Sequence, residues 1–139
     1  MVGPLAHVLG KLGSEHVMVV SSEDGLDEIS CNAPTRVAEL KDGEVKTYII
    51  DPSVFGIASH DRQEITVSSP EESLRLINSV FSGEESAAAD MVTLNSGAAI
   101  YVAGLTDSLA DGISRAQTVV MSGKVRDRFE SFVKLTNSF

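Results

Sequence analysis

With 139 residues, the chain is long enough to bury the core of one domain and too short for two. Its 20 acidic and 11 basic residues give a formal net charge of -9, and the basic residues are scattered, which argues against nucleic acid as a partner. No apolar run approaches the roughly 20 residues of a membrane helix, no leader pattern is present, and the single Cys31 cannot form an internal disulfide. We therefore expect a cytoplasmic protein without membrane contact.

The first predicted elements are a helix, a short turn and a strand. Apolar residues three and four positions apart predict an amphipathic helix that Gly13 ends; they are Leu5, Val8, Leu9 and Leu12. Residues 16–20 form an apolar run that does not alternate, which predicts a strand buried on both faces. This order is typical of one limb of an α/β unit, whose sheet usually places ligands at the carboxyl ends of its strands.

Four carboxylates follow that strand within six positions, at Glu23, Asp24, Asp27 and Glu28. They could form a solvated loop, begin a helix whose dipole favours negative charge, or bind a divalent cation. Mg²⁺ takes few carboxylates, keeps several waters and commonly bridges to substrate phosphates, and Gly25 is suited to the turn that adjacent Asp27 and Glu28 would need. The spacing does not match an EF-hand loop. From the residues alone, a solvated loop that starts a helical turn is the favoured interpretation.

A β-hairpin is predicted next. Residues 35–40 and 45–50 are extended candidates, and Asp42-Gly43 between them tolerates the positive φ angles of a tight turn. The stretch 53–67 shows no period, and we interpret it as a loop.

Helices are predicted through the rest of the chain. Ser69 is expected to cap the first, with Pro70 at the first helical position and Glu72 completing a capping box. Its apolar face would carry Leu74, Ile77 and Phe81, and Gly83 would end it. Residues 90–103 are apolar on nearly every side and rich in small residues, which predicts a buried, closely packed helix.

Two further helices close the sequence. Leu109, Ile113, Ala116 and Val120 mark the first of them, which Gly123 would stop. The last begins at Lys124 and is expected to turn its apolar residues inward, namely Val125, Phe129, Phe132 and Val133.

Nucleophilic catalysis finds little support in the sequence. His7, His16 and His60 are not placed by a recognisable Ser or Cys motif, so we interpret them as ordinary surface or core histidines. Cys31 has no positive neighbour that would lower its pKa. Asn95 is a polar residue inside the apolar helix, and we expect it to hydrogen-bond to neighbouring backbone.

Several of these segments follow one another in a characteristic order. A helix ending in Leu12-Gly13 leads to a strand and then to Asp-Gly-Leu-Asp-Glu at 24–28, followed by the hairpin, the Ala-rich segment 90–104 and Ser-Leu-Ala-Asp-Gly at 108–112. In this order they resemble the C-terminal half of the anthranilate phosphoribosyltransferase family. The resemblance covers essentially the whole chain.

The resemblance implies both a fold and an activity. The fold is α/β: the C-terminal part of the nucleoside phosphorylase/phosphoribosyltransferase α/β domain, with a central sheet, a β-hairpin and packed C-terminal helices, as a single domain over 1–139. The activity is that of a pentosyltransferase, which transfers phosphoribose from phosphoribosyl pyrophosphate to anthranilate in tryptophan biosynthesis. Carried over by motif, Asp27 and Glu28 help to hold Mg²⁺ on the pyrophosphate, and no catalytic nucleophile is required.

The chain also departs from the family. The family's small helical domain, glycine-rich pyrophosphate loop, Lys-His-Gly-Asn segment and anthranilate-facing Arg have no counterpart here, and Ser21-Ser22 replace the His-Gly of many members. We therefore expect a fragment that retains half of a metal site and is inactive alone, with the substrate-binding residues in the missing N-terminal half. If the protein forms an oligomer, we expect a homodimer.

Two other interpretations stay open. The chain could be a noncatalytic α/β module that works through protein association, which the missing phosphate loop would favour. It could also be a relative of pyrimidine nucleoside phosphorylase, against which the Asp-Gly-Leu-Asp-Glu and Ala-rich motifs argue.

Overall fold

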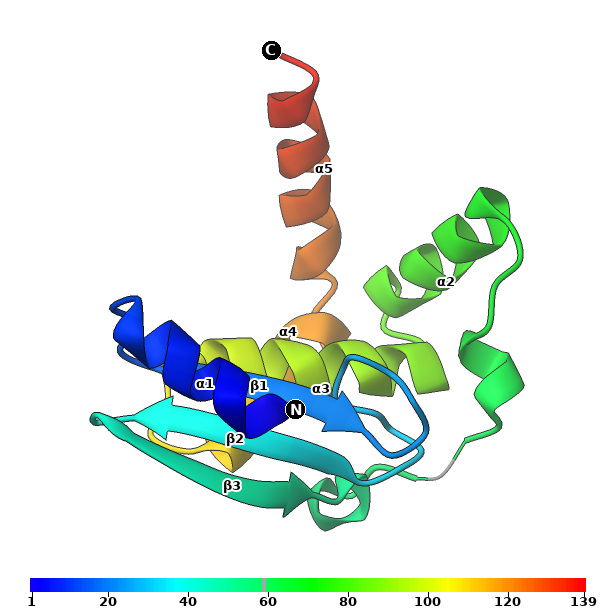
Figure 1. Cartoon of the computed structure of the whole chain (residues 1–139). Helices are drawn as coiled ribbons and strands as arrows, with labels where there is room; N and C mark the ends of the chain where they lie inside the picture. Colours follow the sequence, from blue (N-terminus) through cyan, green and yellow to red (C-terminus); the bar gives the residue numbers. More distant parts are fainter. Residues whose placement is uncertain (59) are drawn as a thin grey trace.

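The computed structural model describes residues 1–58 and 60–139 (Figure 1). Ser59, within the predicted 53–67 loop, lies outside these residues. The elements in chain order are α1 (Val2–Lys11), β1 (Val17–Ser22), β2 (Thr35–Lys41), β3 (Glu44–Ile50), the short 3-10 helices η1 (Pro52–Phe55) and η2 (Arg62–Ile65), α2 (Pro70–Phe81), α3 (Ala87–Val102), α4 (Leu109–Met121) and α5 (Lys124–Thr136). None of the helices in this part of the chain is long and apolar enough to cross a bilayer.

The three strands form one antiparallel sheet in the order β1-β2-β3. The predicted hairpin is confirmed: β2 and β3 pair from Thr35 opposite Ile50 to Lys41 opposite Glu44. At its tip, Asp42 has a φ of 53° and Gly43 a φ of 77°, the left-handed conformation that the Asp-Gly pair was expected to supply. Because β1 also runs antiparallel to β2, the acidic segment connects two neighbouring strands of this sheet rather than a strand and a helix.

Helices cover both faces of the sheet (Figure 1). On one face, Gly10 of α1 lies against Leu40, so closely that an added Cβ would come 3.1 Å from the leucine side chain. On the other face, Val37 joins a core cluster with Leu94 and Ala98 of α3 and Ile113 of α4. The central strand β2 is therefore buried on both faces.

The prediction that residues 16–20 are buried on both faces is wrong in degree. Val17 to Val20 are only half-buried, because β1 is an edge strand of the described sheet and β2 holds the central position. The apolar run correctly predicts a strand with helices on both faces. It does not show whether that strand lies at the centre or at the edge of the sheet.

Small residues bring α3 and α4 together, as the Ala-rich sequence predicts. A Cβ added to Gly97 would lie 2.5 Å from Cα of Ile113, so α4 occupies the space of the missing side chain. The helix begins earlier than predicted, at Ala87, because the Ser86 side chain accepts a hydrogen bond from the Ala89 amide and caps it.

The cap of α2 is confirmed with one difference. Ser69 Oγ accepts a hydrogen bond from the Glu72 amide at 3.1 Å, as expected of an N-cap. The Glu72 carboxylate, however, accepts from the amide and hydroxyl of Ser68, both at 2.7 Å, so the reciprocal bond of the predicted capping box falls one residue earlier.

The inward face predicted for α5 is wrong in this structure, and the apolar face predicted for α2 is only partly covered. Leu74 of α2 is 53% exposed and Phe132 of α5 is 59% exposed. No side chain of Lys124–Thr136 is buried, and α5 projects away from the sheet (Figure 1), with Phe129 contacting Phe81 at 5.2 Å between ring centroids. A helical period identifies an apolar face, but the face is buried only where another element covers it.

Candidate magnesium site in the acidic loop

The acidic loop spans residues 23–34 between the carboxyl end of β1 and the start of β2. It contains no helical turn, so the interpretation of these carboxylates as a helix start is wrong. Its first part is a tight turn in which the Gly25 amide donates to the Ser22 carbonyl at 3.2 Å and the Ser22 amide donates to the Leu26 carbonyl at 3.0 Å. Gly25 has a φ of 91°, as the predicted turn requires.

One of the four carboxylates is turned into the loop. Asp24 Oδ1 accepts from the Ser22 hydroxyl at 2.6 Å and from the Leu26 amide at 3.3 Å, while Oδ2 accepts from the Ser30 hydroxyl at 2.7 Å. Both oxygens of Asp24 are therefore engaged in holding the loop together. A second carboxylate, that of exposed Glu23, pairs with Arg36 of β2 at 3.3 Å.

The far end of the loop is held by α3. Asn95 Oδ1 accepts from the Ile29 amide, and Asn95 Nδ2 donates to the carbonyls of Ile29 and Met91, each at 2.9 Å. The prediction that Asn95 hydrogen-bonds to backbone is confirmed. Ile29 itself is 1% exposed and packs in the core cluster, so the loop re-enters the protein at this point.

Asp27 and Glu28, the residues named from the motif, lie between these two attachments. Both are exposed, and neither has a hydrogen bond or ion pair within residues 1–58 and 60–139. Among the described residues, no group of three or more His, Cys, Asp or Glu could hold a metal ion. Two adjacent, exposed carboxylates suit Mg²⁺, which takes one or two protein carboxylates and completes its octahedron with water and substrate phosphate oxygens.

The three histidines each have a hydrogen-bond partner within the protein. His16 Nε2 lies 2.9 Å from Glu39 Oε1, and the Tyr48 hydroxyl donates to Glu39 Oε2 at 2.9 Å. Burial raises the pKa of Glu39, but hydrogen bonds from Tyr101, His16 and Tyr48 outweigh it and leave the pKa below its usual value. This network could not be found from the sequence, since its members come from two strands, a helix and the turn that precedes β1.

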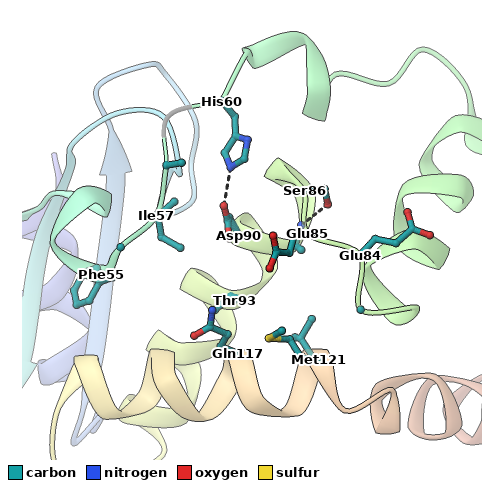
Figure 2. Close-up of a pocket in the computed structure, with 15 residues that line it drawn as sticks. Phe55, Ile57, His60, Glu84, Glu85, Ser86, Asp90, Thr93, Gln117 and Met121 are labelled. Atoms are coloured by element: carbon teal, nitrogen blue, oxygen red, sulfur yellow. Dashed lines mark hydrogen bonds and ion pairs between the residues drawn. The ribbon is translucent and has the colours of Figure 1, made fainter.

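A separate cavity of about 450 Å³ lies between α3, α4 and the segment that follows η1. Figure 2 shows His60 reaching toward Asp90 at the start of α3, with Gln117 and Met121 of α4 on the opposite wall. His60 Nε2 lies 2.7 Å from Asp90 Oδ2, and His60 Nδ1 lies 3.5 Å from Glu64. No residue of the acidic loop lines this cavity, so it is distinct from the candidate metal site.

Cys31 is buried, and its thiol is not activated. Burial, followed by the nearby Asp90 carboxylate, raises the pKa of Cys31 to about 11. The prediction that Cys31 is not a reactive nucleophile is confirmed in this respect.

Comparison with known proteins decides the family. The model of the "Glycosyl transferase family, a/b domain" matches residues 1–126. The chain belongs to the glycosyl transferase family. This family assignment confirms the α/β fold expected from the motifs, and it places the acidic loop and α3 inside the matched region.

Two similar relatives are both anthranilate phosphoribosyltransferases. The chain is 50% identical over 135 residues to anthranilate phosphoribosyltransferase of Thioalkalivibrio sulfidiphilus and 48% identical over 134 residues to that of Vesicomyosocius okutanii. These matches cover 97% and 96% of the chain but 40% of each relative. The resemblance to anthranilate phosphoribosyltransferase is thus confirmed, and the chain spans about two fifths of the length of these relatives.

Solved structures agree. The crystal structure of anthranilate phosphoribosyltransferase from Thermus thermophilus matches with a TM-score of 0.85 and 33% identity, over 96% of this chain and 39% of that one. The Saccharomyces cerevisiae enzyme, solved in complex with PRPP and Mg, matches with a TM-score of 0.77 over 89% of this chain and 36% of that one. At 24% identity, the second match supports the fold alone.

Proposed function

We propose that this chain is the magnesium-binding part of an anthranilate phosphoribosyltransferase, acting in tryptophan biosynthesis in the cytoplasm. The reaction transfers the 5-phosphoribosyl group from phosphoribosyl pyrophosphate to the amine of anthranilate, so the proposed substrates are two small molecules. The observation that carries the proposal is the pair Asp27 and Glu28, exposed and without a protein partner in the described part of the chain, within a loop held at both ends. The names of the relatives support it.

The chemistry explains why such a pair is useful. Departure of pyrophosphate leaves positive character on the ribose and negative charge on the leaving group, and a bound Mg²⁺ ion stabilises that negative charge. Asp27 and Glu28 would bind the hydrated ion through their carboxylates and orient it toward the pyrophosphate. Asp24 and Glu23 have other partners: both oxygens of Asp24 are engaged with Ser22 and Ser30, and Glu23 Oε1 pairs with Arg36.

Calorimetry tests this proposal. Mg²⁺ and phosphoribosyl pyrophosphate are titrated, separately and together, into the chain and into the double variant Asp27→Ala/Glu28→Ala. We expect heat that needs both ligands and disappears in the double variant, while Glu23→Ala, which removes one carboxylate from the same loop, retains it. Equal heat in the double variant would show that Asp27 and Glu28 do not bind the ion. An equal loss of heat in Glu23→Ala would show that the overall negative charge of the loop, and not this pair, is responsible.

One observation favours a second candidate function. The exposed apolar residues of α5, including Phe132 and Leu135, suit a noncatalytic module that works through protein association. Sedimentation of the chain with and without Phe132→Ser separates the two: association that depends on Phe132, together with no binding of Mg²⁺ and phosphoribosyl pyrophosphate, would favour this candidate over the enzyme.

A further inference from the structure

The Asp27–Glu28 pair lies between two residues whose main chains are fixed. Leu26 has its amide bound to Asp24 Oδ1 at 3.3 Å and its carbonyl bound by the Ser22 amide at 3.0 Å. Ile29 has both its amide and its carbonyl bound by the Asn95 side chain at 2.9 Å. The arc between these two points contains only the two candidate ligands, so the positions of their Cα atoms are set by the bonds on either side.

The two attachments differ in origin. Leu26 is held by the loop's own residues, whereas Ile29 is held by a side chain 66 positions further along the chain. Asn95 lies on α3 beside Leu94, which is fully buried, and beside the close contact of Gly97 with α4. The loop is therefore attached, at its end nearest Glu28, to a helix that is closely packed against α4.

The amide of Asn95 has one orientation that satisfies this geometry. Its oxygen faces the Ile29 amide, and its nitrogen faces the two carbonyls of Ile29 and Met91. Rotating the amide by half a turn would bring a donor against a donor and an acceptor against two acceptors. The three bonds therefore fix the side chain of Asn95 as well as the backbone of Ile29.

We propose that Asn95 is a positioning residue for the metal site: by holding Ile29 against α3, it keeps Asp27 and Glu28 arranged for a hydrated Mg²⁺ ion before the ion arrives. This inference rests on the proposed function. Preorganised ligands bind more tightly because no loop has to be ordered on binding, and loss of a group that orients metal ligands typically weakens metal affinity by about 10- to 100-fold. Asn95 itself does not touch the ion.

The test uses Mn²⁺ as a paramagnetic substitute for Mg²⁺, added together with phosphoribosyl pyrophosphate, and it is read in amide NMR spectra of the 139-residue chain. In the unaltered chain, the amide signals of Asp27 and Glu28 should broaden first. Asn95→Leu, which keeps the size but removes all three hydrogen bonds, should weaken this broadening about tenfold or more and accelerate hydrogen exchange at the Ile29 amide. Asn95→Asp, which keeps the acceptor for that amide, should lose less of both.

Two controls separate positioning from general destabilisation. Ser96→Ala changes the next residue of α3 and should alter neither readout. Val120→Ala lowers the melting temperature through a second core cluster, formed with Val80 and Ala89, which contains no residue of the loop, and it should leave the Mn²⁺ affinity unchanged. A loss of affinity in Val120→Ala equal to that in Asn95→Leu would overturn the positioning role.

The outcomes also distinguish this inference from the proposed function. If Mn²⁺ broadens Asp27 and Glu28 equally in the unaltered chain and in Asn95→Leu, although exchange at Ile29 has accelerated, the metal site stands and the role of Asn95 is refuted. If the unaltered chain shows no selective broadening, or the double variant Asp27→Ala/Glu28→Ala broadens in the same way, the proposed metal site itself is refuted.

Discussion

Replacing Gly97 by Ala is expected to destabilise the protein, although the same change usually stabilises a helix. The new Cβ would lie 2.5 Å from Cα of Ile113 and 2.7 Å from its backbone nitrogen. Backbone atoms of α4 cannot move aside as a flexible side chain would, so α3 and α4 must separate. Overpacking of this kind costs about 1–3 kcal/mol, against a gain of about 1 kcal/mol from replacing Gly inside a helix. Because the clash is with backbone atoms, the cost lies in the upper part of its range, at about 2–3 kcal/mol, and we expect a net loss of roughly 1–2 kcal/mol.

Thermal unfolding followed by circular dichroism measures this effect. At this chain length each kcal/mol shifts the melting temperature by about 3 °C, so Gly97→Ala should lower it by about 3–6 °C. Gly3→Ala is the matched control, since Gly3 lies in α1 and an added Cβ there would meet nothing within 4 Å. A melting temperature of Gly97→Ala that is unchanged or raised, as expected for the control, would refute the close packing of α3 on α4.

Three further changes test other parts of the structure. Gly43→Ala forces a residue with a Cβ into a φ of 77°, so it should lower the free energy of unfolding, measured in urea, by about 1–2 kcal/mol. An unchanged urea midpoint would contradict the conformation of the hairpin turn. The pKa of Glu39 is lowered in the folded protein, so the ionised carboxylate stabilises the fold at a pH above 4.5, the ordinary pKa of the group. This stability is lost as the pH falls through the lower pKa of the folded state. Glu39→Gln should therefore make the free energy of unfolding less dependent on pH in this acid range. Cys31, with its pKa raised to about 11, should react with iodoacetamide slowly in the folded protein and rapidly after denaturation, and equal rates would show that the thiol is not buried.

Local sequence signals located most elements of this fold. The hairpin follows from Asp42-Gly43, where the backbone conformation is decided by the two residues themselves. The cap at Ser69 is equally local. The degree of burial was not predictable in the same way: β1 is half-buried and α5 has no buried residue, because burial depends on which elements lie alongside, and an apolar pattern does not name them.

In the candidate site, too, local features could be predicted from the sequence and long-range contacts could not. The motif at 24–28 predicted Asp27 and Glu28 as ligands, and both are exposed in the structure; their binding of Mg²⁺ stays a prediction. The backbone role of Asn95 was predictable because a polar side chain in an apolar helix needs a nearby partner. The identity of that partner, Ile29, could not be predicted, since the contact joins segments 66 residues apart. The inward turn of Asp24 toward Ser30 likewise depends on the folded path of the loop.

The layering of the sheet on α3 and α4 has a consequence for how the chain folds. Within each layer, partners are neighbours in sequence: β1 pairs with β2, β2 with β3, and α3 packs on α4. The core that joins the layers links distant segments, with Ile29, Cys31, Val37 and Ile50 from one side and Ala87, Leu94, Ala98 and Ile113 from the other. Local pairings close short loops at small entropic cost, while contacts across a long connection form late. Docking of the two layers is therefore the natural rate-limiting step, and the Asn95–Ile29 contact, which spans the same divide, forms only when that step is complete.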